Sequence, residues 1–183
     1  MLTSLLVAGF GGQGVMMIGK LIGECAFEQG VNVTFLPSYG PEQRGGTANC
    51  TVILSDEAIG SPVSDELDVL CAMNQPSLIK FVENVKPGGV IIANSSLVDV
   101  SVIERKDVKI IDIDADTIAY EIGSNKIANI IMFAAYMEIS NTMPMDSVRE
   151  LVLKKLGKKP EFVKLNAEAF DKGVEIAKIA FLK

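Results

Sequence analysis

Short apolar runs separated by turn-forming residues fill the first 113 residues of the chain. Most of these runs are too short for a helix and are bounded by Gly, Pro, Asn or Asp, which is typical of buried strands. They predict six strands, at residues 2–8, 31–36, 48–54, 69–73, 90–94 and 108–113. The residues between 55 and 68 are irregular and predict no element.

Helical periodicity appears between two of these strands and again after the last one. In residues 15–29, one stripe at helical spacing carries Val15, Ile18, Ile22, Cys25 and Ala26. Gly19 and Gly23 lie close to this stripe, where the absence of a side chain lets the helix approach the sheet. The sequence therefore predicts a helix that packs tightly on the strands.

Five further helices are predicted from caps and periodicity. Asn74 followed by Pro76 marks a helix start, and that helix runs to about residue 85. After the last strand, helices are expected at 116–122, 126–140, 146–156 and 166–182, with Asp146 as the N-cap of the third of these.

This order of elements favours an α/β fold with a mostly parallel, doubly wound, Rossmann-like sheet and a helical C-terminal part. We find no internal repeat or low-complexity linker, so residues 1–183 are expected to form a single domain.

The composition argues against some classes of function. The net charge is -6, with 23 acidic and 17 basic residues, and this argues against nucleic-acid binding. No apolar run is long enough for a membrane span, so we expect a cytoplasmic protein. The mean hydropathy of +0.33 is high for a free monomer, which indicates that apolar surface faces other chains.

The chain contains no histidine and three cysteines, Cys25, Cys50 and Cys71. It therefore has no Ser-His or Cys-His nucleophile pair, and too few thiolates for a four-cysteine iron–sulfur cluster. Each cysteine sits in an apolar segment, so we expect reduced, buried, structural thiols.

A glycine-rich loop follows the first predicted strand. Gly9, Gly11 and Gly14 fit the dinucleotide-binding fingerprint between a strand and a helix. That function also calls for an acidic residue at the end of the second strand, and residues 35–38 contain none. Three interpretations stay open: dinucleotide binding, a tight structural turn, and contact with an anion or partner, in which Gln13 could supply an amide.

Residues 36–50 form a turn-rich segment that also carries charged side chains, which a simple connecting loop does not need. Arg44 precedes Gly45 and Gly46, so its guanidinium can project toward a carboxylate, a phosphate or a partner chain. The alternative is a surface turn with a weak ion pair between Glu42 and Arg44. Because the glycine loop ends a neighbouring parallel strand, we expect the two segments to meet at one end of the sheet.

Taken together, these motifs resemble the gamma subunit of 2-oxoacid:ferredoxin oxidoreductases, most closely the 2-oxoisovalerate and 2-oxoglutarate types. The resemblance rests on residues 9–15, 38–50 and 55–62, with Asn129 and residues 164–173 in support. One departure is Phe133-Ala134, where family members often have Leu-Gly.

The resemblance implies a complex that converts a 2-oxoacid, coenzyme A and oxidised ferredoxin into an acyl-CoA, carbon dioxide and reduced ferredoxin. Thiamine diphosphate, Mg²⁺ and iron–sulfur clusters would be held by other subunits, and this chain would bind no cofactor alone. Its partners would be the alpha, beta and ferredoxin-like delta subunits. The gamma chain would complete the assembly and border the approach of coenzyme A.

The resemblance implies binding or interface roles, and no catalytic or metal-binding role, for Gly11, Gly12, Gln13, Gly14, Tyr39, Glu42, Arg44, Gly45 and Gly46. Two other functions remain open at this stage. One is a stand-alone Rossmann-type oxidoreductase that binds a nucleotide or flavin, and the other is a scaffold module with no role in turnover.

Overall fold

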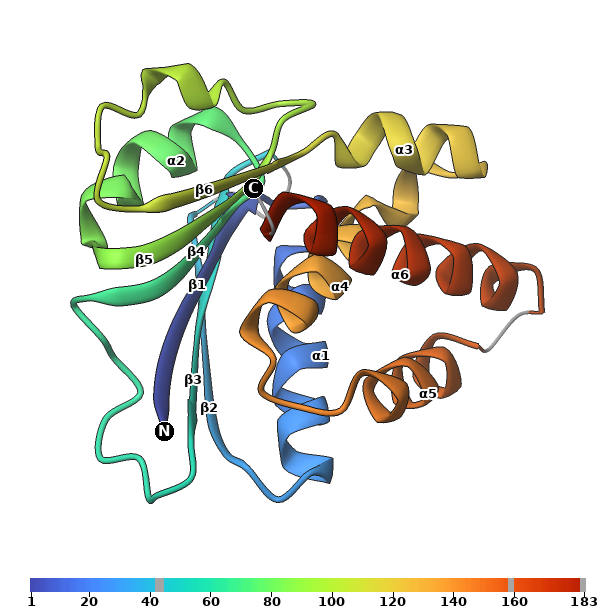
Figure 1. Cartoon of the computed structure of the whole chain (residues 1–183), viewed down its shortest axis with the longest axis horizontal. Helices are drawn as coiled ribbons and strands as arrows, with labels where there is room; N and C mark the ends of the chain where they lie inside the picture. The colour runs from blue at the N-terminus through green and yellow to red at the C-terminus, as the bar shows by residue number, and fades with distance from the viewer. Residues whose placement is uncertain (42–44, 158–159, 182–183) are drawn as a thin grey trace.

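The computed structural model describes residues 1–41, 45–157 and 160–181. A six-stranded sheet carries helices on both faces (Figure 1). The strand order is β2-β3-β1-β4-β5-β6, where the bounds are β1 Leu2–Phe10, β2 Asn32–Tyr39, β3 Thr47–Ser55, β4 Leu67–Ala72, β5 Val85–Asn94 and β6 Lys109–Ile113.

The predicted α/β fold with a mostly parallel sheet is confirmed. β1, β4, β5 and β6 pair in parallel, while β3 pairs antiparallel with both β1 and β2. Five strands therefore point one way and β3 alone points the other way. In this sheet β3 separates β2 from β1.

β2 and β3 form a longer hairpin than the sequence predicts. We expected the strand to end at Leu36, but Pro37 pairs with Cys50 inside the ladder and β2 continues to Tyr39. The N–H of Gly40 donates to the carbonyl of Thr47 at 2.8 Å. Hydrogen-bonded and non-bonded pairs alternate in antiparallel ladders, so Pro37 falls in a non-bonded pair and its missing N–H faces the outer edge.

The predicted turn at residues 86–89 is also wrong, since these residues lie inside β5. The register of β5 against β4 shifts between Leu67 and Val69, and Gly88 adopts a positive φ of 79°. An irregularity in the ladder thus absorbs a Pro-Gly-Gly sequence that would ordinarily end a strand.

The helices follow the predicted order, with corrected ends. They are α1 Val15–Glu28, α2 Gln75–Phe81, α3 Ala115–Ile122, α4 Ala128–Ser140, α5 Met145–Leu156 and α6 Pro160–Phe181, with 3₁₀ turns at Val82–Asn84, Val100–Val102 and Asn125–Ile127. No helix in the described ranges is long and apolar enough to cross a membrane.

The starts of α2, α5 and α6 can be compared with the starts predicted from the sequence. Asn74 caps α2 as predicted, because its side chain accepts from the N–H of Ser77 at 2.9 Å. The prediction for α5 is wrong: Pro144 occupies the N-cap, and Asp146 lies in the first turn, where its charge favours the helix dipole. α6 starts six residues earlier than predicted because Pro160 is well tolerated at a first helical position.

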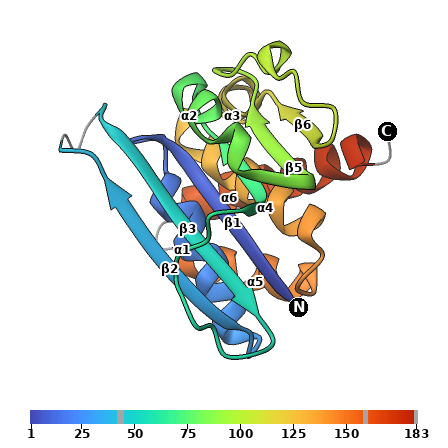
Figure 2. The ribbon, with the colours of Figure 1, turned by 90° about the vertical axis from the view of Figure 1, so that its left-hand side faces the viewer.

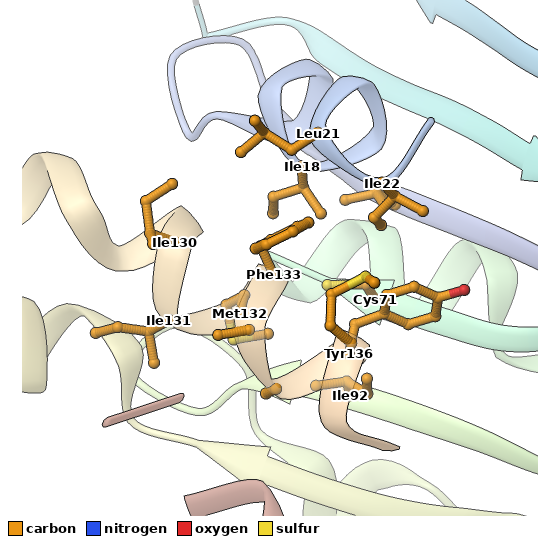
Figure 3. Packing of buried hydrophobic residues seen from close by; sticks show 14 of the residues in the cluster. Ile18, Leu21, Ile22, Cys71, Ile92, Ile130, Ile131, Met132, Phe133 and Tyr136 are labelled. Atoms are coloured by element: carbon orange, nitrogen blue, oxygen red, sulfur yellow. The ribbon is translucent and has the colours of Figure 1, made fainter. Parts of the chain in front are cut away.

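The main core lies between the sheet and α1, α4 and α6, while a smaller core lies under α2. α4 is apolar on every side and buries nine of its residues, so it forms the centre of the larger layer. Phe133 on α4 points toward Ile18 on α1 (Figure 3), and its ring centroid lies 6.3 Å from that of Phe170 on α6.

Two glycines allow close packing of these layers. A Cβ atom on Gly19 would lie 2.9 Å from Cε2 of Phe35, so the predicted close approach of α1 to the sheet is confirmed at this position. A Cβ atom on Gly173 of α6 would lie 2.9 Å from Cβ of Ala134 on α4.

Cys25, Cys50 and Cys71 are free and buried, as predicted. Burial raises the pKa of each thiol to about 12, whereas an unfolded cysteine has a pKa of about 8.5. The native state therefore holds these protons more strongly, and this contribution to stability is complete below about pH 8.5. It is lost as pH rises toward 12.

We expect the free energy of unfolding to fall between pH 8 and pH 10.5 in urea titrations. Cys71→Ala should flatten this slope, because it removes one of the three thiols. At pH 8.5, iodoacetamide should modify none of the three thiols in the folded chain and all of them in urea. Native-state labelling as fast as in urea would contradict the buried, protonated state.

Candidate binding site at the carboxyl ends of β1 and β4

From β1 the chain continues toward the edge of the sheet formed by β2, and from β4 it continues toward the opposite edge, formed by β6. The crevice between the carboxyl ends of β1 and β4 is thus the topological switch point, where open α/β sheets bind ligands. A cavity of about 340 Å³ lies there. The glycine loop, Met73 after β4, Asp116 on α3 and the start of α4 line it.

Glycine is required at two positions of the loop 11–14. Gly12 and Gly14 have φ values of 102° and 79°, which side-chain-bearing residues rarely adopt. Gly14 is the N-cap of α1, and a Cβ atom there would lie 2.8 Å from Cβ and Cγ of Asn129 on α4. The loop is therefore shaped both by its own backbone and by α4.

Gln13 holds the floor of the site together. Its Oε1 accepts from the N–H of Phe10 at 2.7 Å, and its Nε2 donates to the carbonyl of Met73 at 2.9 Å. Nδ2 of Asn74 also donates to Oε1 of Gln13, at 3.4 Å. The Gln13 amide, which the sequence offered as a ligand donor, is engaged by the ends of β1 and β4.

The far wall of the cavity is polar. Asn94 at the end of β5 donates to Oδ2 of Asp116 at 2.6 Å and accepts from the N–H of Ala115 at 3.2 Å. Nearby, a hydrogen bond from Ser96 holds the pKa of Asp114 below its usual range. The pairing of Asn94 with Asp116 fixes the start of α3 beside the cavity.

Two further residues that line the cavity, Lys126 and Asn129, do not take part in these hydrogen bonds of the far wall. Lys126 is exposed and lines the cavity. Oδ1 of Asn129 is buried and has no hydrogen-bond partner within the described part of the chain. Sequence motifs did not identify Asp116 or Lys126, because they come from α3 and a 3₁₀ turn far from the glycine loop in sequence. Asn129 was noted only through the family resemblance.

The hairpin tip meets the glycine loop at the same end of the sheet, as predicted. The N–H of Gly11 donates to the carbonyl of Gly46 at 2.9 Å, which joins the two segments directly. Tyr39 is exposed at the end of β2, and Gly45 has a positive φ of 74°. Glu42 and Arg44 lie outside the described residues, so their predicted roles receive no structural account.

The sheet order disfavours a dinucleotide site. In a Rossmann fold the second strand carries the ribose-binding acid next to the glycine loop. Here β3 lies between β1 and β2, and β2 ends with Ser38 and Tyr39. Among the described residues, no group of three or more His, Cys, Asp or Glu side chains could hold a metal ion. The sheet order thus argues against a dinucleotide site.

Comparison with known proteins gives the family. Residues 4–176 match the family described as pyruvate ferredoxin/flavodoxin oxidoreductase, and the chain belongs to it. The chain is 35% identical over 173 residues to ketoisovalerate oxidoreductase subunit VorA of Methanothermobacter marburgensis. This match covers 94% of the chain and 36% of the relative, so the chain spans about a third of that protein.

Two solved structures share the fold. One is the gamma subunit of a keto/oxoacid ferredoxin oxidoreductase from Geobacter sulfurreducens, with a TM-score of 0.82, 28% identity, and 97% and 99% of the two chains covered. The other is 2-oxoglutarate:ferredoxin oxidoreductase from Magnetococcus marinus with 2-oxoglutarate, coenzyme A and succinyl-CoA bound. It matches with a TM-score of 0.88 and 28% identity over 97% of this chain and 31% of the other.

Proposed function

We propose that this chain is the gamma subunit of a multi-subunit 2-oxoacid:ferredoxin oxidoreductase. The complex would decarboxylate a 2-oxoacid oxidatively and transfer the acyl group to coenzyme A, with ferredoxin as electron acceptor. The observation that carries the proposal is the switch-point cavity between the glycine loop and α4, which is lined by apolar side chains such as Met73 and by the charged side chains of Asp116 and Lys126. Such a cavity is suited to bind and orient a substrate.

The reacting groups would come from other chains. We assign thiamine diphosphate, Mg²⁺ and the iron–sulfur clusters to the alpha, beta and ferredoxin-like delta subunits. This fits the described residues, among which no group of three or more His, Cys, Asp or Glu side chains could hold a metal ion. The complex would be cytoplasmic and would bind neither nucleic acid nor membrane. Residues 1–183 would act within it as a single domain.

Coenzyme A would approach across the switch-point cavity. The first N–H groups of α1 lack helical acceptors, as at every helix start, and favour anionic groups. The ammonium of Lys126 offers a charge for a phosphate, and the side chain of Asn129 forms part of the cavity wall. Gly11, Gly12 and Gly14 would keep the loop backbone open to the ligand, with Gln13 holding it in place.

The hairpin tip would complete the site on the other side. We propose that Tyr39, Glu42 and Arg44 contact coenzyme A or a neighbouring subunit, with Gly45 and Gly46 shaping the turn. An arginine beside two glycines suits a phosphate or a carboxylate of either partner.

Anaerobic affinity purification of the chain from its native cells tests the assembly. We expect a thiamine-binding chain and a ferredoxin-like chain to co-purify, with dye reduction that requires both a 2-oxoacid and coenzyme A. The chain alone should be inactive. A lone chain that carries a bound dinucleotide or flavin would instead establish the stand-alone oxidoreductase.

Variants of the assembled complex test the site. Lys126→Gln should raise the apparent KM for coenzyme A by about tenfold, the effect of one lost charged hydrogen bond. Arg44→Ala should raise the same KM or weaken assembly. Lys80→Gln on α2 is the matched control, because α2 covers the other face of the sheet. Unchanged assembly and KM in both test variants would remove these residues from the site.

A further inference from the structure

The outer side of α1 and the neighbouring edge of β2 form one apolar surface. Met17, Lys20, Glu24 and Phe27 recur at spacings of three and four residues, so they share one face of α1. Met17 is 41% exposed and Phe27 is 75% exposed. This face turns away from the buried stripe of the helix.

β2 continues this surface at the edge of the sheet. Alternate residues of a strand share a face, so Phe35 and Tyr39 point to the same side as Val33, which lies against Gly23 of α1. Phe35 is 38% exposed and Tyr39 is 63% exposed. Figure 2 shows β2 as the outermost strand, with α1 beside it. We call Met17, Phe27, Phe35 and Tyr39 the aromatic face.

A cavity of about 260 Å³ lies within the aromatic face. Gly23, Phe27, Val33 and Phe35 form its apolar lining, and charged side chains stand at its rim. At that rim Nζ of Lys155 lies 3.1 Å from Oε2 of Glu24. An apolar hollow inside a charged rim is the usual form of an interface anchor site.

The sequence of the edge strand β2 indicates that another protein covers this surface. β2 has no charged residue over eight positions, whereas β6, the opposite edge, carries Lys109 and Asp112. Uncharged edges are an aggregation hazard unless something covers them. Pro37 lacks an N–H on the outer side of β2, so a partner strand could not accept a hydrogen bond there. A partner is therefore expected to use side chains at this edge.

We infer that the aromatic face docks a larger, heterologous subunit of the same enzyme, which inserts an apolar side chain between Phe27 and Phe35. This inference rests on the proposed function. Met17 belongs both to the aromatic face and to the lining of the switch-point cavity, so a subunit that covers this face would reach the edge of that cavity.

The lengths of relatives support a large partner. In the ketoisovalerate oxidoreductase subunit, the region equivalent to this chain makes up 36% of the protein. That region is covalently joined to a remainder of larger size. By analogy, we expect a separate, larger subunit to lie against this chain.

Phe27→Lys is the test, because Phe27 is the most exposed member of the face and a lysine near the end of α1 favours the helix dipole. Ile79→Lys on α2 is the control, since Ile79 is 63% exposed on a helix that covers the other face of the sheet. Co-expressed subunits are titrated against each purified variant, and thermal unfolding of each chain verifies its fold.

We expect Phe27→Lys to weaken binding of the partner subunit at least tenfold, and Ile79→Lys to leave it within twofold. Equal affinity of Phe27→Lys and the wild type would overturn the inference while leaving the proposed function intact. So would a wild-type homodimer that Phe27→Lys dissociates, because the occupant would then be a second copy. A wild-type chain that recruits no other subunit would reject the proposed function itself.

Discussion

Gly14→Ala is expected to destabilise the fold by about 2–5 kcal/mol, a large fraction of the stability of a typical domain. Two costs add. The positive φ of 79° is unfavourable for alanine, and the new Cβ would clash with the amide nitrogen of Asn129 and lie 2.8 Å from its Cβ and Cγ atoms. Urea unfolding measures the loss, and coenzyme A binding by the assembled complex should fall with it because α4 moves away from the loop.

Gly30→Ala separates the two costs. Gly30 has a φ of 73° and no neighbouring atom within 4 Å of an added Cβ, so alanine there should cost only the conformational part, about 1–2 kcal/mol. The excess for Gly14→Ala reports the contact with α4. Equal losses for the two variants would show that Asn129 yields without cost.

Phe133→Ala is expected to cost about 3–5 kcal/mol, the usual loss for a buried phenylalanine. Phe133 is fully buried between α1 and α6, and its ring lies against that of Phe170. The helices around it cannot collapse freely into the space, because α4 is enclosed on all sides. Chemical denaturation of the full chain measures the change.

Phe27→Ala provides the matched control for this prediction. Phe27 is 75% exposed, so its removal should change the free energy of unfolding by less than about 0.5 kcal/mol. Phe133→Leu should cost less than Phe133→Ala, because leucine keeps most of the apolar volume. A loss for Phe133→Ala as small as that for Phe27→Ala would contradict the central place of α4 in the core.

The sequence predicted the elements whose signals are local. The buried stripe of α1 is visible in its spacing, and every member of it is buried in the structure. The cap at Asn74 is equally local, since a side chain and an N–H three residues apart define it. The convergence of the glycine loop with the hairpin tip followed from the general geometry of parallel sheets.

What the sequence could not show depends on distant partners. Pro37 reads as a loop residue until its place in the ladder is known, because only the pairing with β3 decides whether its missing N–H matters. The position of β3 between β1 and β2 has no local signal either. Gln13 looked like a ligand donor because its acceptor, the Met73 carbonyl, lies 60 residues away.

The hydrogen bond between Gly11 and Gly46 joins the glycine loop directly to the hairpin tip. The hairpin belongs to the edge where we place the partner subunit, and the loop belongs to the ligand cavity, so we expect a shift of one backbone to move the other. If subunit docking changes ligand affinity by some factor, linkage requires the ligand to change docking by the same factor. Assembly and substrate occupancy would then regulate each other reciprocally, with no separate effector.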